Sequence, residues 1–394
     1  MTILLWILGL LGFVYAIIDT ALLHGLARLM RPRRRFVGTS AEDTAFPSVA
    51  ILVCARNEEH NIAACLDSLL RQNYTGEWKI VVADDRSEDA TAAILARYAA
   101  QYPERIQTIR IDELPSGLSP KKHALTQLHS VVNSEIVVLT DADCIVLPTW
   151  ISGMASCFGT GVDWVSGYSE FPARGAYFSL LNGVQALDFL SHRTVDAAGV
   201  GLGAPITACG QNLAFRRVIF AELGGFEGVA GVVSGDDDLL MHKLAAKRPQ
   251  AIRYATDPGT FVLSRGAETW SRAWEQRKRW ASKTVHYNMQ TVILLGSVFA
   301  FYLLLLCGGV LSLVAWLAGA SPLWPIAFAM AWVWKTAWDA LVTARGIRLF
   351  HAGHLWLWFV PTALLHIPMI VGAVLVGIFG KFTWKDSGTK RVAG

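Results

Sequence analysis

Carboxylates recur along this chain at positions where chemistry could be done. Asp84-Asp85 ends one apolar run, Asp141-Ala142-Asp143 ends a second, and Asp236-Asp237-Asp238 follows much later. Paired carboxylates at strand ends offer oxygen ligands to Mg²⁺ or Mn²⁺, which also bind substrate phosphates. A separate later acid suits a general base. The order of these acids therefore indicates chemistry on an anionic, metal-bound ligand.

The composition indicates a globular domain with membrane segments at its two ends. The chain has 394 residues, of which 53% are hydrophobic and 15 are Trp, whereas soluble domains have about 45–50% apolar residues. The net charge is only +4. Because the basic residues cluster beside the apolar ends and not along a polar face, we expect no nucleic-acid partner.

Several short motifs are missing from the sequence. The six Cys form no C-x-x-C or His-paired spacing, and most lie in or beside apolar runs. We therefore expect buried free thiols in a reducing compartment. No G-x-x-x-x-G-K-[ST] or G-x-G-x-x-G occurs, which argues against a P-loop ATPase or a dinucleotide-binding dehydrogenase.

The N-terminal segment is predicted to be a membrane anchor at residues 1–28. Residues 3–23 are apolar apart from Asp19 and match the roughly 20 residues that cross a bilayer core. A basic juxtamembrane linker at 29–45 follows, and the arginines of this region are Arg28, Arg31, Arg33, Arg34 and Arg35. A secretory signal carries its charge before the apolar core, so the span is not a cleaved leader. The positive-inside rule places the N-terminus outside and the next domain in the cytoplasm.

The C-terminal region, residues 291–380, contains three further apolar stretches, at 291–318, 323–343 and 354–380. Lys335 and Asp339 lie one helical turn apart, and they either pair or face a polar cavity. One anchor and three crossings would place the polar tail, 381–394, outside. Its basic residues instead favour the cytoplasm; they are Lys381, Lys385, Lys390 and Arg391. Two solutions stay open: the last stretch, kinked at Pro361 and Pro368, dips in and returns, or one apolar run does not span.

Residues 46–268 alternate between strand and helix patterns. Short apolar runs predict strands at 49–54, 79–83, 106–111 and 135–140, and the periodicity predicts a helix at 62–70. Ser87 or Asp89 can cap another helix that begins near Ala90. This alternation predicts an α/β domain with a mostly parallel sheet and helices on both faces. Ligands bind at the carboxyl ends of such strands, where both acid pairs fall.

Each of these motifs also has a simpler interpretation. The pair at 84–85 would suit a solvated turn, and the acids at 141 and 143 would suit a helix or turn cap. The run at 236–238 would complement a helix dipole. Segment 269–290 is rich in Trp, Arg and Lys, which predicts an amphipathic helix at the membrane interface with snorkelling basic side chains.

Taken in order, the motifs resemble those of the membrane-bound family 2 glycosyltransferases, whose catalytic domain has the Rossmann-like GT-A fold. The resemblance covers about residues 46–285. The matching segments are Cys54-Ala55-Arg56-Asn57-Glu58-Glu59, Asp84-Asp85-Arg86-Ser87, Pro120-Lys121-Lys122-His123-Ala124-Leu125, Asp141-Ala142-Asp143, Gly210-Gln211-Asn212-Leu213-Ala214-Phe215-Arg216, Gly235-Asp236-Asp237 and Gln276-Arg277-Lys278-Arg279-Trp280. Cys54 stands where the family usually has Pro, and Asp236 where it has Glu.

The resemblance implies a role for each segment. Asp143 with Asp141 is expected to bind Mn²⁺ or Mg²⁺. The catalytic residues are Asp237 and its neighbour Asp236, and aligning Leu240 and Leu244 with the family's leucines makes Asp237 the base. The donor is expected to contact Asn57, Glu58, Asp84, Asp85, Lys122, Asp141, Gln276, Arg279 and Trp280. For Lys122, a solvated helix start is the alternative.

The expected function is transfer of a single sugar from a nucleotide sugar, such as UDP-glucose, to a hydroxyl of a membrane lipid. One displacement with an Asp237 base inverts the anomeric centre. The enzymes that this chain resembles glycosylate lipids such as ceramide, hopanoids or carotenoids. We place the protein in a bacterial-type inner membrane as a multi-pass enzyme with a cytoplasmic catalytic domain.

Rival functions are less well supported. Q-x-x-R-W also occurs in processive synthases of the cellulose and hyaluronan type, but three C-terminal stretches are few for an export channel. The aromatic segment 168–205 would suit an apolar acceptor approach or ordinary core. Intact acids argue against a non-catalytic receptor with a degenerate transferase domain, and a transporter would need more spans and internal repeats.

Overall fold

The computed structural model describes residues 2–31 and 46–380 in full, and the backbone of 381–384 and 387–391. Arg33, Arg34 and Arg35, with most of the predicted linker, and Lys385 of the tail lie outside the described residues. The chain divides into two units. Unit 1 comprises residues 1–26, 173–194 and 266–394, and unit 2 comprises residues 27–172 and 195–265.

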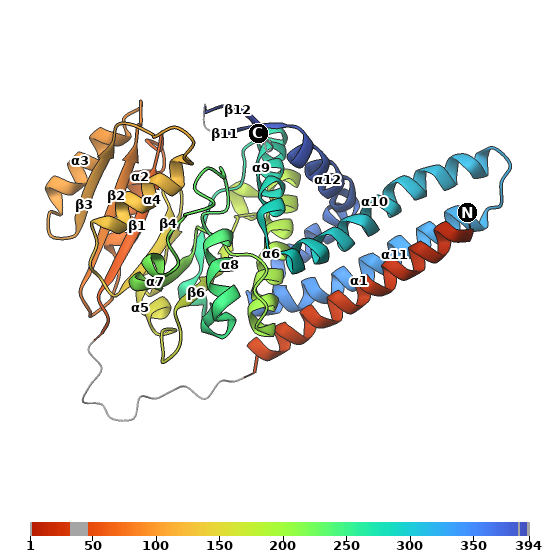
Figure 1. The fold of residues 1–394 in the computed structure, drawn as a ribbon, viewed down its shortest axis with the longest axis horizontal. Coiled ribbons are helices and arrows are strands. Elements are labelled where there is room, and N and C mark those ends of the chain that lie inside the picture. Colours follow the sequence, from red (N-terminus) through yellow and green to blue (C-terminus); the bar gives the residue numbers. More distant parts are fainter. Residues whose placement is uncertain (1, 32–45, 385–386, 392–394) are drawn as a thin grey trace. The chain divides into compact units, whose positions relative to one another are not determined.

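Unit 2 is built around a seven-stranded sheet, with strand order β3-β2-β1-β4-β8-β6-β9 (Figure 1). The strands are β1 (Val49–Ala55), β2 (Trp78–Asp85), β3 (Ile106–Ile111), β4 (Ile136–Asp141), β6 (Trp164–Gly167), β8 (Leu213–Arg216) and β9 (Ile252–Ala255). The first four strands are mutually parallel, whereas β8 runs antiparallel to β4 and β6. The mostly parallel sheet and its four predicted strands are confirmed.

A small sheet, short helices, residues 195–202 of α6 (Leu180–Leu202) and the 3-10 helices η2 (Pro249–Ala251) and η3 (Pro258–Thr260) complete the described part of unit 2. The small sheet has the order β5-β10-β7, and its strands are β5 (Ile145–Val146), β7 (Ser169–Glu170) and β10 (Val262–Leu263). The helices are α2 (Ile62–Leu70), α3 (Thr91–Gln101), α4 (Pro120–Ser130), α5 (Trp150–Ala155), α7 (Arg217–Glu222) and α8 (Asp238–Lys247). Asp89 accepts a hydrogen bond from Thr91 N at 3.0 Å, as expected of a residue at the start of α3.

The strands of the parallel region are buried on both faces, which explains their continuous apolar sequences. Ile51 and Val53 share one hydrophobic core with Leu66 of α2 and Leu95 of α3. Helix α4 also contacts β1 and β2, yet no described α4 residue belongs to that core. Helix α4 therefore covers the opposite face, and the predicted helices on both faces are confirmed.

Unit 1 is helical. Its helices are α1 (Thr2–Leu29), α6 (Leu180–Leu202, of which 180–194 belong here), α9 (Trp270–Ser282), α10 (Met289–Leu317), α11 (Leu323–Leu349) and α12 (Phe359–Phe379). Short 3-10 helices η1 (Gly175–Tyr177), η4 (Lys283–His286) and η5 (Gly353–Trp358) and a hairpin of β11 (Lys381–Trp384) and β12 (Ser387–Arg391) accompany them. Among the described residues, three segments are long and apolar enough to cross a membrane: α1, α10 and Gly353–Phe379.

Helices α11 and α12 contain the charged pair and the two prolines that the sequence singled out. Lys335 and Asp339 of α11 form an ion pair, with Nζ 2.6 Å from Oδ2, so the predicted pairing is confirmed. Helix α12 is assigned without interruption through Pro368, and Pro361 lies in its first turn.

Helix α12 and the residue before it pack against α6 and α9. A Cβ placed on Gly183 of α6 would lie 2.0 Å from the ring of Trp358, which immediately precedes α12. Near its other end, Gly372 allows similarly close approach of Trp274 of α9, and Gly377 faces the Lys278 carbonyl. Glycine therefore permits close packing at both ends of α12.

We expect Gly183→Ala to destabilise the protein. The new methyl group would overlap a buried Trp358 ring that has no room to retreat, and overpacking of this kind costs about 1–3 kcal/mol. Thermal unfolding in detergent should show a Tm several degrees lower. Gly309→Ala in α10 is the matched control, because nothing lies within 4 Å of its added Cβ. Equal Tm values for the two variants would contradict the prediction.

Candidate active site

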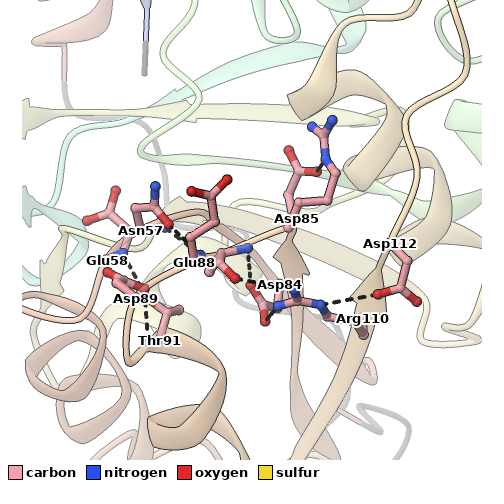
Figure 2. A network of polar contacts seen from close by, with 11 residues as sticks. Asn57, Glu58, Asp84, Asp85, Glu88, Asp89, Thr91, Arg110 and Asp112 are labelled. Carbon is pink, nitrogen blue, oxygen red and sulfur yellow. Dashed lines mark hydrogen bonds and ion pairs between the residues drawn. The ribbon is translucent and has the colours of Figure 1, made fainter. Parts of the chain in front are cut away.

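The loops that follow β1 and β2 are joined by hydrogen bonds (Figure 2). Asn57 has a left-handed backbone, with φ at 52°, and its N–H donates to Ser87 Oγ at 3.1 Å. The Asn57 Oδ1 accepts from Glu88 N at 2.9 Å, while Glu58 N donates to Thr91 Oγ1 at 2.8 Å. Asn57 and Glu58, both predicted donor contacts, therefore join the two loops to each other.

Asp84 and Asp85 end β2 as predicted, and both carboxylates have protein partners. Asp84 is buried and accepts hydrogen bonds from the Arg110 guanidinium and from Ser87 N (Figure 2). Asp85 pairs with Arg86 Nε at 2.8 Å. The Asp84–Arg110 pair thus joins the end of β2 to β3, and a donor contact by either acid stays a prediction.

Lys121 joins two of the predicted acids. Its Nζ lies 2.7 Å from Asp141 Oδ1 and 3.1 Å from Asp236 Oδ2. Burial alone lowers the pKa of Lys121, but the two carboxylates together raise it well above its ordinary value. A cation is therefore held between the end of β4 and the segment before α8. Lys121 was not among the residues predicted from the sequence, because spacing alone does not show which of two consecutive lysines reaches the acids.

Lys122 points elsewhere. Its buried ammonium donates to three backbone carbonyls, those of Val229 at 2.9 Å, Val232 at 2.7 Å and Ser234 at 3.0 Å. This contact holds the segment that leads into Gly235-Asp236-Asp237. Because the Lys122 ammonium is buried, Lys122 is not a solvated helix start, and its contact with the donor stays a prediction.

Asp237 is the most accessible of the three consecutive acids. It is the N-cap of α8, with Oδ1 accepting from Asp238 N at 2.8 Å and Oδ2 accepting from Gly210 N at 2.9 Å. Asp238 is fully buried and accepts from Ala208 N at 2.5 Å. The acids do begin a helix, and the same contacts fix the orientation of a partly exposed carboxylate.

Asp141 and Asp143 have the donor atoms expected of a divalent metal site. Among the described residues, no three His, Cys, Asp or Glu side chains form a cluster that could hold a metal by themselves. Mg²⁺ and its relatives are usually bound through one or two carboxylates together with substrate phosphates and water. Two carboxylates leaving β4 therefore fit a metal that arrives with a phosphorylated ligand.

In unit 1, the helix with Gln276, Arg279 and Trp280 is supported by α6. Arg277 and Asp188 form an ion pair, and their side chains are only 5% and 2% exposed. Burial lowers the pKa of Arg277, and Asp188 opposes that shift. Lys278 is also buried and pairs with Glu275 at 2.5 Å. The snorkelling predicted for these basic residues is therefore wrong, because their charges find partners inside the protein.

Trp280 lies in a socket made by the same two helices. The Arg277 guanidinium carbon is 4.4 Å from the centre of the Trp280 ring. Phe189 and His192 of α6 place their rings 5.9 Å and 5.8 Å from it. The Arg277–Asp188 pair therefore sets the position of Trp280 through direct stacking. Asp188 lies in no recognisable sequence motif, so its role could not be predicted from the sequence.

Comparison with known proteins places these features in context. Residues 4–376 match the profile of Glycosyl transferase family 21. The chain is 26% identical over 244 residues to the probable glycosyltransferase YdaM of Bacillus subtilis, covering 60% of this chain and 54% of that protein. It is 35% identical over 100 residues to the beta-monoglucosyldiacylglycerol synthase of Trichormus variabilis, covering 25% of this chain and 21% of that protein. The chain thus spans about half the length of the first relative and a fifth of the second.

A solved structure shares the architecture. The mannosyltransferase PcManGT from Pyrobaculum calidifontis, in complex with GDP-Man and Mn²⁺, aligns with a TM-score of 0.57 at 19% identity. The alignment covers 95% of this chain and 99% of that one. The predicted GT-A fold is confirmed.

A double-mutant cycle tests the buried pair in unit 1. Asp188→Leu and Arg277→Met should each lower the Tm strongly, because breaking a buried pair costs about 3–5 kcal/mol by leaving one charge uncompensated. The double variant should recover much of that loss, since two apolar side chains replace two partners. Thermal unfolding in detergent provides the measurement. Additive losses in the double variant would show that the two residues act independently.

Proposed function

Because this chain belongs to glycosyl transferase family 21, we propose that it transfers one sugar from a UDP-linked donor to the hydroxyl of a membrane lipid, with inversion. The protein is a glycosyltransferase with a GT-A fold. The observation that carries the proposal is the arrangement around Asp237. Its partly exposed carboxylate is held by two backbone N–H groups and lies beside acids that pair with the Lys121 ammonium.

Asp237 suits the role of general base. Its two oxygens are oriented by Gly210 N and Asp238 N, so little reorganisation is needed when it accepts the proton of an acceptor hydroxyl. A positioned base typically contributes a factor of about 10²–10⁴. The deprotonated oxygen attacks the anomeric carbon directly, which inverts the configuration as the nucleoside diphosphate leaves.

Lys121 and the acids of β4 suit the leaving diphosphate. Asp141 and Asp143 would hold Mn²⁺ or Mg²⁺, which when bound neutralises charge developing on the phosphates. The Lys121 ammonium, already held at this edge of the sheet, adds a second positive charge. PcManGT, which shares the fold, was solved with Mn²⁺ and a nucleotide sugar, and this supports the assignment. The donor contacts predicted for Gln276, Arg279 and Trp280 remain part of the proposal.

A lipid acceptor is supported by the relatives and by the apolar helices. The synthase from Trichormus variabilis is named for a glucosylated diacylglycerol, and three segments of this chain are long and apolar enough to cross a bilayer. The alternative is a processive polysaccharide synthase. The few long helices of unit 1 favour the lipid, because a polymer channel requires more.

We also propose that α1, α10 and α11 span the membrane and that α12 does not, although α12 and not α11 is among the described segments that are long and apolar enough to cross. The residue before α12, Trp358, contacts α6, and its last turns contact α9, at Gly372 and Gly377. Both ends of α12 therefore lie on the α6–α9 side of unit 1. Three crossings with an interfacial α12 return the basic tail to the cytoplasm, in agreement with the positive-inside rule.

The transfer reaction is tested with radiolabelled UDP-glucose and Mn²⁺ on membranes that contain the wild type or Asp237→Asn. We expect label in the organic-solvent phase for the wild type and a loss of at least about a hundredfold for the variant, because the base is removed. Glu104→Gln, an exposed carboxylate change, is the control and should keep full activity.

Other results of this assay would separate the alternatives. Label in ethanol-insoluble material would replace the lipid by a polymer as product. Full activity of Asp237→Asn would exclude it as the base, and Asp236→Asn would then be compared.

Reporter fusions test the topology. A fluorescent protein fused at the C-terminus should fold and fluoresce, because the tail is expected in the cytoplasm. Alkaline phosphatase fused after Ala320, between α10 and α11, should be active, because that loop is expected outside. Active phosphatase at the C-terminus instead would mean that α12 crosses the bilayer.

A further inference from the structure

Polar side chains meet inside the apolar helices of unit 1. We call this group the polar cluster; its members are Tyr15 and Asp19 of α1, Tyr302 of α10, Lys335 and Asp339 of α11, and His366 of α12. They adjoin the hydrophobic core of the bundle, to which both tyrosines belong. Ionisable groups in such a position are costly, and in membrane helices they usually serve a function.

Most of the polar cluster is internally satisfied. Lys335 is fully buried, and its Nζ lies 2.6 Å from Asp339 Oδ2 and 2.8 Å from His366 Nδ1. Because an ammonium only donates, His366 Nδ1 accepts and the ring is neutral. Tyr15 donates to the other Asp339 oxygen at 2.5 Å and lies 3.0 Å from the Tyr302 hydroxyl. Lys335 and Asp339 therefore cancel each other's charge.

Asp19 is different. It lies one helical turn beyond Tyr15, on the same face of α1, and is only 5% exposed. The negative charge of Asp339 disfavours an ionised Asp19, whereas the positive charge of Lys335 favours it. Among the described residues, its Oδ2 has no hydrogen-bond partner. A buried carboxylate oxygen without a donor is unfavourable in an apolar environment, so the cluster has one unfilled acceptor position.

The cluster lies beside the Trp280 socket. Asp188 of α6, which pairs with Arg277, also interacts electrostatically with His366 of α12. His192, whose ring packs on Trp280, lies 3.9 Å from Asp188 and interacts with His366 as well. A line of polar groups thus extends from the Q-x-x-R-W helix into the apolar bundle.

We propose that the polar cluster binds the hydroxylated head of the lipid acceptor within the bilayer, with Asp19 accepting a hydrogen bond from its hydroxyl. This inference rests on the proposed function and names a recruitment site that precedes transfer. A neutral hydroxyl fits better than an anion, because the Asp19 carboxylate would repel a phosphate head.

The alternative is that the cluster only joins the helices, as polar groups in membranes often do. Asp19 separates the two roles. Since its Oδ2 has no donor in the protein, Asp19→Leu should leave the Tm unchanged or raise it, because an unpaired buried charge is replaced by an apolar side chain. Ser312→Ala is the control, because the fully buried Ser312 hydroxyl donates to the Gly309 carbonyl of its own helix and has no other partner among the described residues.

The experiment measures binding and transfer separately on the purified full chain in detergent. The probes are 1,2-dioctanoylglycerol, C8-ceramide and 1,2-dioctanoyl-3-acetylglycerol, in which the hydroxyl is masked. At least one hydroxylated lipid should raise the Tm of the wild type and of Ser312→Ala, but not that of Asp19→Leu. The masked lipid should raise none. With a transferred acceptor, Asp19→Leu should raise the acceptor KM about tenfold or more, as expected for a lost hydrogen bond to a charged group, with kcat retained.

The outcomes are distinct. An equal Tm rise in Asp19→Leu, a rise with the masked lipid, or no rise in the wild type with either hydroxylated lipid would overturn the proposal. Stabilisation of the wild type by Na⁺ alone, lost in Asp19→Leu, would make this a cation site and overturn it too. A lipid-induced rise lost in Asp19→Leu, with no sugar transfer by the wild type, would support the binding site while refuting the proposed function.

Discussion

The in-register pairing of β1 with β2 on one side and with β4 on the other is the constraint on which unit 2 depends. Ala55 of β1 lies opposite Asp84, and Cys54 lies opposite Asp141. Acids that are far apart in the chain therefore emerge at one edge of the sheet. The loops that follow β1 and β2 are then joined by hydrogen bonds around Asn57 and Ser87, which makes that edge a defined surface and not a set of separate turns.

Four buried or half-buried cations join elements in the two units, and each is compensated differently. Lys121 is held by two carboxylates, whereas Lys122 is held by three backbone carbonyls. Arg277 has one buried carboxylate and an aromatic ring, and Lys335 has a carboxylate and a neutral imidazole. Buried charges contribute little net stability. Each one instead fixes a segment: Lys121 the acid cluster, Lys122 the loop before Asp236, Arg277 the position of Trp280, and Lys335 the polar cluster.

The helical unit is assembled from distant parts of the sequence. Residues 173–194 separate two parts of unit 2, yet they supply Asp188, Phe189 and His192 to the Trp280 socket. Close packing of α12 on α6 and α9 depends on Gly183, Gly372 and Gly377. These features connect the motif helix to the apolar helices.

The sequence by itself determined the elements whose signals are local. Continuous apolar runs predicted the parallel strands, because burial on both faces leaves no alternation. Acids directly after those runs were placed correctly, since a strand's end is visible in its composition. Helical spacing offered the pairing of Lys335 with Asp339 as one of two alternatives, and the structure shows the pair. The ordered short motifs identified the GT-A glycosyltransferase fold.

Only the tertiary structure decided which neighbour of a pair reaches which partner. Lys121 and Lys122 are equivalent in sequence, but a helix turns adjacent side chains by about 100°, so one reaches the acids and the other the loop carbonyls. Arg277 and Lys278 suggested solvent-seeking side chains until their partners, Asp188 and Glu275, were in place. Asp19 carried no signal beyond an acid in an apolar run. Within the described part of the chain, the lack of a hydrogen-bond partner for Asp19 Oδ2 depends on four packed helices, because each neighbouring element decides which donors reach a buried oxygen.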